Sequence, residues 1–197
     1  MSNLDNPRDY ANATFYTWHS RYTSPDEHSY KHLDDFIEEI LYTDFEPNEL
    51  MDAIKSSIFE NLMLKPTEND GEYNLFWKPS YREHFLNVDA YYENCTLTDE
   101  DGHDSSVLEA IREQPETIKL LRQKYYIKPV YMLDHSAHYY STTPFIDKWD
   151  SGLVGIVFIS HEDATKLFGN VKDLDEKAEK LLDDEVAEYS AWINDEC

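Results

Sequence analysis

Hydrophobic residues in the first quarter of the chain follow the spacing of helices. Five apolar positions recur at intervals of three and four residues: Leu33, Phe36, Ile37, Ile40 and Leu41. Such spacing predicts one buried helical face. Ser24, with Pro25 and two acidic residues after it, has the composition of a helix start, so we expect this helix to begin there. Pro47 opens a second predicted helix, whose apolar face is Leu50, Met51, Ile54 and Ile58.

The second half of the chain contains the clearest predicted strands. Residues 126–133 (YIKPVYML) and 153–159 (LVGIVFI) are short apolar runs, and the second is apolar enough to be central in a sheet. Pro129 inside the first run indicates an edge strand or a bulge, because proline lacks the N–H group that a strand ladder uses. Residues 13–22 alternate and are rich in threonine and aromatic side chains, which predicts a third strand.

Helix signals return after the last predicted strand. Ser160 is expected to cap a short helix that ends at Gly169. Residues 173–192 predict a long acidic helix with one apolar stripe, formed by Leu174, Ala178, Leu181, Leu182, Val186 and Tyr189.

The middle of the chain carries weaker patterns. Residues 65–71 and 98–106 are polar and are interpreted as loops. Residues 72–94 are aromatic without a clear period, and residues 107–124 predict a helix that is broken near Pro115.

Few strands and several flanking helices favour an α+β fold, with a small, mostly antiparallel sheet flanked by acidic helices. We expect one domain over residues 1–197, since this length suits a single core. The chain has five glycines and no glycine-rich phosphate loop, so we expect no nucleotide cofactor and assign no other cofactor.

Composition narrows the class of protein. Hydrophobic residues are 41% of the chain and aromatic residues 14%, which is too much for a disordered chain. No apolar run approaches the roughly 18 residues of a membrane span, and the first residues lack the features of a secretory signal. The two cysteines, Cys95 and Cys197, favour a reducing compartment over a disulfide framework. We therefore expect a cytoplasmic protein.

Charge is the most unusual property of the sequence. Aspartate and glutamate number 41 against 17 lysines and arginines, for a formal net charge of −24. Such a surface repels nucleic acids and anionic membranes and attracts basic partners. Three interpretations compete: a solubilising surface, adaptation to high salt, and a mimic of nucleic-acid charge. Lysine outnumbers arginine, which argues against adaptation to high salt.

Two acidic runs are the candidate surface for a basic partner. Their residues are Asp34, Asp35, Glu38, Glu39, Asp173, Asp175, Glu176, Glu179, Asp183, Asp184 and Glu188. Carboxylates at positions i and i+4 of a helix lie about 6 Å apart, which is comparable to the phosphate spacing of a nucleic-acid strand, about 3.4 Å of rise plus a lateral displacement. Residues 173–197 contain ten acids and two lysines, so we expect this charge to be uncompensated.

The densest group of polar residues lies between the two clearest strands. Its candidate site residues are Asp134, His135, Ser136, Thr142, Thr143, Trp149, Asp150, Ser151 and Gly152. Adjacent residues of an extended chain point to opposite faces, so the first three cannot form a catalytic triad among themselves, and we assign no catalytic residue. We expect this segment to fold back over the sheet as a hydrogen-bonded loop. In that loop Asp150 would accept hydrogen bonds from backbone or hydroxyl groups, Trp149 would be an apolar anchor, and Gly152 would occupy a backbone position that a side chain would disturb.

Histidines offer two candidate groups of metal ligands. His135 and His138 lie near Asp134, whereas His28 and His32 are four residues apart, and His19 or His84 could join either group. Pairs at this spacing are common by chance on acidic helices, and the chain has no EF-hand pattern. We therefore assign no metal site.

Three segments resemble a known family. They are residues 129–136 (PVYMLDHS), 141–145 (STTPF) and 149–155 (WDSGLVG). The resemblance is to uncharacterised proteins of phages and other mobile elements that share a DHSG, STxPF and WDSGxVG core. Residues 18–22 (WHSRY) and 185–192 (EVAEYSAW) are similar to two further family segments.

The chain departs from the family pattern at three positions. Ala137 replaces the usual glycine, His138 replaces an apolar residue, and Leu153 replaces a glutamine. The resemblance implies an origin in a mobile element and carries over no catalytic residue.

Charge and resemblance together lead to a functional hypothesis. Small acidic proteins of mobile elements resemble anti-CRISPR and anti-restriction factors. We expect an anti-defence inhibitor that acts in the cytoplasm of a host cell and binds a basic nucleic-acid-binding defence protein, a CRISPR effector or a restriction enzyme. Direct binding to nucleic acid or membrane is not expected, and no enzymatic activity is assigned. The alternative is an enzyme or metalloprotein that uses Asp134, His135 and Asp150.

Overall fold

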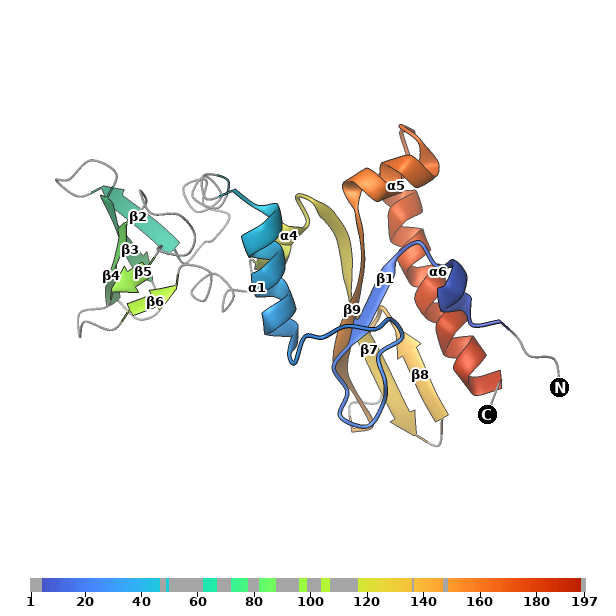
Figure 1. Cartoon of the computed structure of the whole chain (residues 1–197). Coiled ribbons are helices and arrows are strands. Elements are labelled where there is room, and N and C mark those ends of the chain that lie inside the picture. Colours follow the sequence, from blue (N-terminus) through green and yellow to red (C-terminus); the bar gives the residue numbers. More distant parts are fainter. Residues whose placement is uncertain are drawn as a thin grey trace. The chain divides into compact units, whose positions relative to one another are not determined.

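The computed structural model describes residues 5–46, 49, 62–66, 72–77, 82–87, 96–98, 104–106, 117–135, 137–146 and 149–195 (Figure 1). The chain divides into two compact units. One comprises Met1–Leu33 and Arg122–Cys197 and is called the terminal unit; the other, Asp34–Leu121, is called the central unit. The expectation of a single domain over the whole chain stays a prediction.

A four-stranded antiparallel sheet organises the terminal unit. Its strands lie in the order β1 (Thr14–Thr17), β9 (Ser151–Ser160), β7 (Tyr125–His135) and β8 (Ala137–Ser141). The long pairing of β7 with β9 runs from Tyr125 opposite Ser160 to Leu133 opposite Ser151. The sheet and its covering helices confirm the predicted α+β class, and β9 is central as its apolar sequence predicted.

Helices cover one face of this sheet. They are α5 (His161–Phe168) and α6 (Leu174–Asp195), and the short 3-10 helix η1 (Pro7–Tyr10) lies beside α6 (Figure 1). The buried core between sheet and helices contains Phe15, Val130, Met132, Tyr140, Val157, Ile159, Ala164, Ala178, Leu182 and Val186. The predicted apolar stripe of the last helix is therefore confirmed.

The proline in β7 is accommodated by local strand geometry. A register shift between Val130 and Tyr131 confirms the predicted bulge. Strand β7 as a whole is not an edge strand, because it pairs with β9 on one side and with β8 on the other. Strand β8 pairs with β7 only from Tyr131 onwards, so Pro129 lies in the part of β7 that precedes this second ladder.

The expected helix start at Ser24 is wrong. The side chain of Ser24 instead accepts a hydrogen bond from the backbone N–H of Thr17, at 3.0 Å. Asp26, two residues later, binds the backbone N–H of Phe15 at 2.6 Å. These contacts with β1 hold the segment as a loop, and helix α1 (Leu33–Asp44) begins only at Leu33. The predicted strand over residues 13–22 is correspondingly shortened to β1.

The local signals around α5 are confirmed. The side chain of Ser160 accepts a hydrogen bond from the backbone N–H of Asp163, and Gly169 ends the helix with a φ of 76°. A positive φ is easiest for glycine, which explains why the helix stops there.

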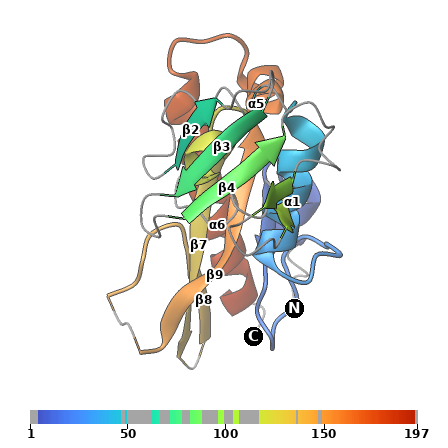
Figure 2. The same ribbon diagram turned by 90° about the vertical axis from the view of Figure 1, so that its left-hand side faces the viewer.

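The central unit contains α1 from Asp34 onwards, the short helix α4 (Thr117–Leu121) and a second sheet. The strands of this antiparallel sheet follow sequence order: β2 (Leu62–Pro66), β3 (Glu72–Trp77), β4 (Arg82–Asn87), β5 (Thr96–Thr98) and β6 (Asp104–Ser106). Figure 2 shows β2, β3 and β4 side by side.

The sequence did not indicate this second sheet. Lys65 and Pro66 belong to β2, so the loop expected over residues 65–71 is wrong at its start. The loop expected over residues 98–106 contains the end of β5 and all of β6. Apart from Glu49, the helix expected from Pro47 lies outside the described residues, as does the first part of the predicted helix 107–124. None of the described helices is long and apolar enough to cross a bilayer.

Candidate functional site

One side of α6 faces away from the core and carries most of its acidic residues. The exposed positions are Asp175, Glu176, Lys180, Asp183, Asp184, Ala187, Glu188 and Ala191. Most recur at the three- and four-residue intervals of one helical face. We call Glu176, Asp183, Asp184 and Glu188 the acidic stripe.

Part of the charge of α6 is compensated by the neighbouring strand. The ammonium group of Lys128 on β7 lies 2.8 Å from the carboxylate of Glu179 and 2.9 Å from that of Asp183. Burial opposes the charge of Lys128, but these two carboxylates outweigh it and raise its pKa. The sequence suggested an uncompensated run because Lys128 is more than fifty residues from Asp183.

Asp183 and Asp175 also accept hydrogen bonds from side chains of the sheet. The hydroxyl of Thr142 donates to Asp183 at 2.6 Å. Burial would raise the pKa of Asp183, but the bonds from Thr142 and Lys128 lower it below its usual value. The phenol of Tyr126 donates to Asp175 at 2.6 Å, and burial together with this bond raises the pKa of Tyr126 to about 12.

The remaining carboxylates of the candidate surface have weaker partners. Asp173 lies 3.4 Å from Lys177, and Asp184 pairs with Lys180, one helical turn away in each case. Glu176 and Glu188 have no side-chain partner among the described residues.

The acids of α1 belong to the central unit. Asp34, Asp35 and Glu39 are exposed, and Glu38 is half-buried on the same helix. The two predicted acidic runs therefore lie in different units and are treated separately.

The side chain of Asp134 connects residues 18–22 with residues 129–136, two segments that lie far apart in the sequence. Its carboxylate accepts hydrogen bonds from the guanidinium of Arg21 at 2.6 Å and from the phenol of Tyr22 at 3.2 Å. The Nδ1 atom of His138 lies 3.3 Å from the same carboxylate, and the rings of Tyr22 and His138 are 4.0 Å apart. Tertiary structure thus brings the WHSRY segment against the DHS segment.

His135 and Asp150 form an exposed pair at the end of the sheet. Their Nδ1 and Oδ2 atoms are 2.9 Å apart, with side-chain exposures of 74% and 42%. The backbone carbonyl of Asp150 also accepts a hydrogen bond from the N–H of Asp134, at 2.8 Å. The carboxylate of Asp150 thus pairs with an imidazole, whereas backbone or hydroxyl donors were expected, and the polar segment is mostly strand and not one long loop. Ser136 lies outside the described residues.

Other expectations for this segment are wrong or only partly met. Trp149 is 97% exposed and anchors no core. A side chain at Gly152 would meet no atom within 4 Å, whereas a Cβ at Gly155 would collide with the carbonyl oxygen of Tyr16. The hydroxyl of Thr143 lies 3.0 Å from that of Ser141, and Ser151 is the first residue of β9.

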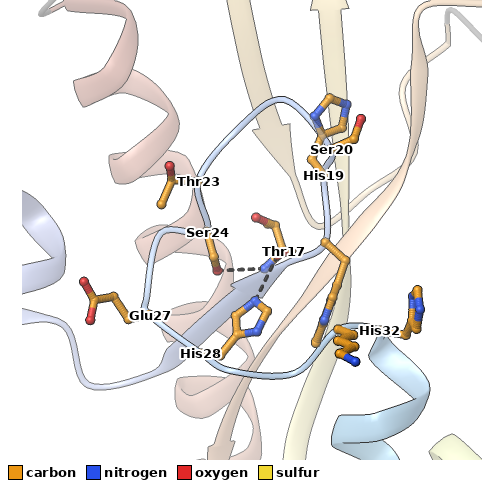
Figure 3. A pocket seen from close by; sticks show the side chains of 10 residues that line it. Thr17, His19, Ser20, Thr23, Ser24, Glu27, His28 and His32 are labelled. Carbon is orange, nitrogen blue, oxygen red and sulfur yellow. Dashed lines mark hydrogen bonds between the residues drawn. The ribbon is translucent and has the colours of Figure 1, made fainter.

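Among the described residues, no three histidine, cysteine, aspartate or glutamate side chains lie together so that they could hold a metal ion. His19, His28 and His32 nevertheless line one pocket, although their rings do not converge (Figure 3). The side chain of His84 lies outside the described residues.

This pocket lies within the loop that follows β1, and we call it the loop pocket. Its volume is about 600 Å³, and its lining residues are Thr17, Trp18, His19, Ser20, Thr23, Ser24, Glu27, His28, Lys31 and His32. Figure 3 shows the loop curving around the side chain of Thr17. The sequence indicated His19, His28 and His32 only as metal candidates and did not indicate the cavity.

Several hydrogen bonds hold the loop in this shape. Nε2 of His28 donates a hydrogen bond to the backbone carbonyl of Thr17, at 3.0 Å. The indole N–H of Trp18 donates to the carbonyl of Tyr30 at 3.2 Å. The ring of His28 lies 4.8 Å from the rings of both Tyr16 and Trp18, so the loop packs on the sheet through aromatic contacts.

Comparisons of this chain with protein-family models, with curated proteins and with solved structures find no match.

Proposed function

We propose that this protein is an anti-defence inhibitor of a phage or other mobile element. In this proposal it binds a basic nucleic-acid-binding protein of the host, a CRISPR effector or a restriction enzyme, through the acidic stripe of α6. The observation that carries the proposal is the exposure of Glu176, Asp184 and Glu188 on the solvent-facing side of α6, where no positive charge of a described residue outside α6 is paired with them.

The spacing of the stripe suits a surface that normally binds phosphates. Glu176 and Glu188 are twelve residues apart, which corresponds to about 18 Å along a helix. Asp184 and Glu188 are four residues apart, which places their side chains about 6 Å from each other. A row of lysines and arginines that follows a nucleic-acid backbone could pair with such a row of carboxylates.

The stripe is also held rigidly, which favours binding. Ala178, Leu182 and Val186 anchor the opposite side of α6 in the core, and Lys128 ties the helix to β7. A surface that is already ordered loses little conformational entropy when a partner binds.

The proposed mechanism is competitive occupation of a nucleic-acid groove. A formal charge of −24 would steer the inhibitor towards a basic groove from a distance. Screening limits this attraction to about 8 Å at physiological ionic strength, so the association rate should fall as salt is added.

The test is inhibition of purified defence nucleases, an RNA-guided nuclease and a restriction endonuclease, with DNA as competitor. We expect inhibition at one-to-one stoichiometry that DNA relieves and that weakens between about 50 mM and about 200 mM salt. Inhibition that does not respond to salt or to DNA would contradict charge mimicry.

A matched pair of variants locates the surface. Glu176→Gln with Glu188→Gln removes two charges from the stripe, whereas Asp9→Asn with Glu162→Gln removes two exposed charges from η1 and α5. The stripe variant should bind about tenfold more weakly, at ~0.7 kcal/mol for each lost contact. The control should bind like the wild type, and equal losses would point to net charge alone.

A second candidate function is an enzyme that uses the His135–Asp150 pair. A carboxylate that binds Nδ1 of histidine leaves Nε2 to act as a general base. In this case Asp150→Asn should abolish hydrolysis of an activated ester without lowering the melting temperature. The 74% exposure of His135 makes this the weaker candidate, because water is not excluded from the pair.

A further inference from the structure

The loop pocket does not share the acidic excess of the chain. Acidic residues outnumber basic ones 41 to 17 in the whole sequence. The residues that line the pocket include one carboxylate, that of Glu27, one lysine, Lys31, and three histidines. The histidines are His19, His28 and His32. A cavity of this composition suits an anion better than the acidic stripe does.

Hydrogen-bond donors line the same cavity. Nδ1 of His19 accepts a hydrogen bond from the backbone N–H of Arg21 at 3.2 Å, so Nε2 carries the proton of the neutral ring. The hydroxyls of Ser20 and Thr23 are exposed and have no partner among the described residues. Ser24 accepts a bond from Thr17, and its own hydroxyl hydrogen remains for a ligand. Donors of this kind are what the oxygens of a phosphate group require.

A buried hydroxyl marks the inner wall of the pocket. Thr17 is 3% exposed, and its Oγ1 atom has no hydrogen-bond partner among the described residues. Leaving such a group unpaired is unfavourable, because it has lost its hydrogen bonds to water. Figure 3 shows the Thr17 side chain inside the curve of the loop, between Ser20 and Ser24. A ligand that enters the loop could satisfy this hydroxyl.

The size of the cavity defines the rest of the ligand. A volume of about 600 Å³ lies in the range of about 300–1,000 Å³ typical of small-molecule sites. It is much larger than a free phosphate needs, and Trp18 adds an apolar wall. We infer that the loop pocket binds a small phosphate monoester with an organic group of about nucleoside size. This site is separate from the acidic stripe and goes beyond the proposed inhibitor function.

The net charge of the protein does not prevent such binding. Repulsion from distant carboxylates is screened beyond about 8 Å at physiological ionic strength. The donors of the pocket would act at hydrogen-bond distance, where charge-assisted bonds are strongest.

The test uses three probes of defined chemistry: inorganic phosphate, adenosine monophosphate and adenosine. Calorimetric titration at physiological salt should show binding of the monophosphate and competition by phosphate. Adenosine should bind at least about tenfold more weakly, since it lacks the charged group.

Variants with matched controls assign the binding to this pocket. Lys31→Gln and His32→Gln should each weaken the monophosphate about tenfold. Lys166→Gln and His161→Gln make the same changes on α5, outside the pocket, and should leave affinity unchanged. Thr17→Val removes the buried hydroxyl at nearly constant shape, and it should weaken binding without lowering the melting temperature.

Three results would overturn the inference. The first is no saturable binding of phosphate or the monophosphate up to about 10 mM, which is weaker than the affinities of ordinary specific sites. The second is equal affinity for adenosine, which would assign the pocket to a neutral ligand. The third is an equal loss in the α5 controls, which would show a diffuse charge effect and no built site.

Discussion

The guanidinium of Arg8 lies 3.0 Å from the carboxylate of Glu185, although the two residues are 177 positions apart in the chain. Arg8 also binds both carboxylate oxygens of Asp26, at 2.9 Å and 2.6 Å. The Arg8 side chain is only 5% exposed. Burial opposes its charge, but the two carboxylates outweigh this and raise its pKa. The contact fastens the start of the chain and the loop after β1 to α6.

Arg8→Ala should therefore be strongly destabilising, because it leaves the buried carboxylate of Glu185 without its positive charge and with only the backbone N–H groups of Asn12 and Ala13 as donors. We expect a loss of about 3 kcal/mol in the free energy of unfolding, or a fall of roughly 6–12 °C in melting temperature. Chemical denaturation measures the first quantity and calorimetry the second. Arg122→Ala removes the same side chain from an exposed position and should change little. Equal effects of Arg8→Ala and Arg122→Ala would contradict a stabilising role for the contacts of Arg8 with Asp26 and Glu185.

Substitution by alanine should destabilise the protein at Gly155 but not at Gly152. A Cβ at Gly155 would collide with backbone and side-chain atoms of Tyr16 and Thr17 on β1, so Gly155→Ala should cost about 1–3 kcal/mol. A Cβ at Gly152 meets nothing within 4 Å, so Gly152→Ala should stay within about 0.5 kcal/mol of the wild type. Urea midpoints of the two variants make the comparison, and similar midpoints would show that β1 shifts to make room.

Asp134 and Asp150 should differ in their contribution to stability. The Asp134 side chain is 21% exposed and binds both Arg21 and Tyr22, so Asp134→Ala should cost about 1–2 kcal/mol. Asp150 pairs with an exposed histidine, and Asp150→Ala should cost less than about 1 kcal/mol. Melting curves should show a clear shift for the first variant only. A larger shift for Asp150→Ala would mean that its carboxylate has a structural role that the exposed pair does not explain.

The ionised carboxylate of Asp183 should make the free energy of unfolding depend on pH in the acidic range. Its folded-state pKa is lowered below the usual 3.8 by Thr142 and Lys128, which outweigh its burial. The stabilisation by ionised Asp183 is therefore fully present above pH 3.8, and it is lost as the pH falls through the lower pKa that Asp183 has in the folded state. Asp183→Asn should lower stability at neutral pH, and its difference from the wild type should vanish in strong acid. Unfolding measured across acidic pH tests this sign.

A second variant tests whether the hydrogen bond from Thr142 lowers the pKa of Asp183. Thr142→Val removes the hydroxyl that donates to Asp183 and should weaken the same acid dependence. A pH profile identical to the wild type would mean that this bond does not lower the pKa of Asp183 in solution.

The sequence by itself determined the elements whose signals are local. The apolar stripe of α6 follows from side-chain periodicity, and the strands β7 and β9 follow from short apolar runs. The stop at Gly169 follows from the backbone freedom of glycine. Such signals act within a few residues of the chain. They survive folding wherever no distant contact competes with them.

Tertiary structure decided where distant residues meet, and that is where the sequence predictions were wrong or incomplete. Serine is a common residue at the start of a helix, yet the side-chain oxygen of Ser24 accepts a hydrogen bond from the backbone N–H of Thr17 on β1. Lys128 compensates Asp183 because β7 lies against α6. Hydrogen bonds and ion pairs act over about 3 Å in space whatever the separation along the chain. Local patterns therefore indicated the buried face of α6 and the central position of β9, while only the fold decided which charges are paired and where the loop pocket lies.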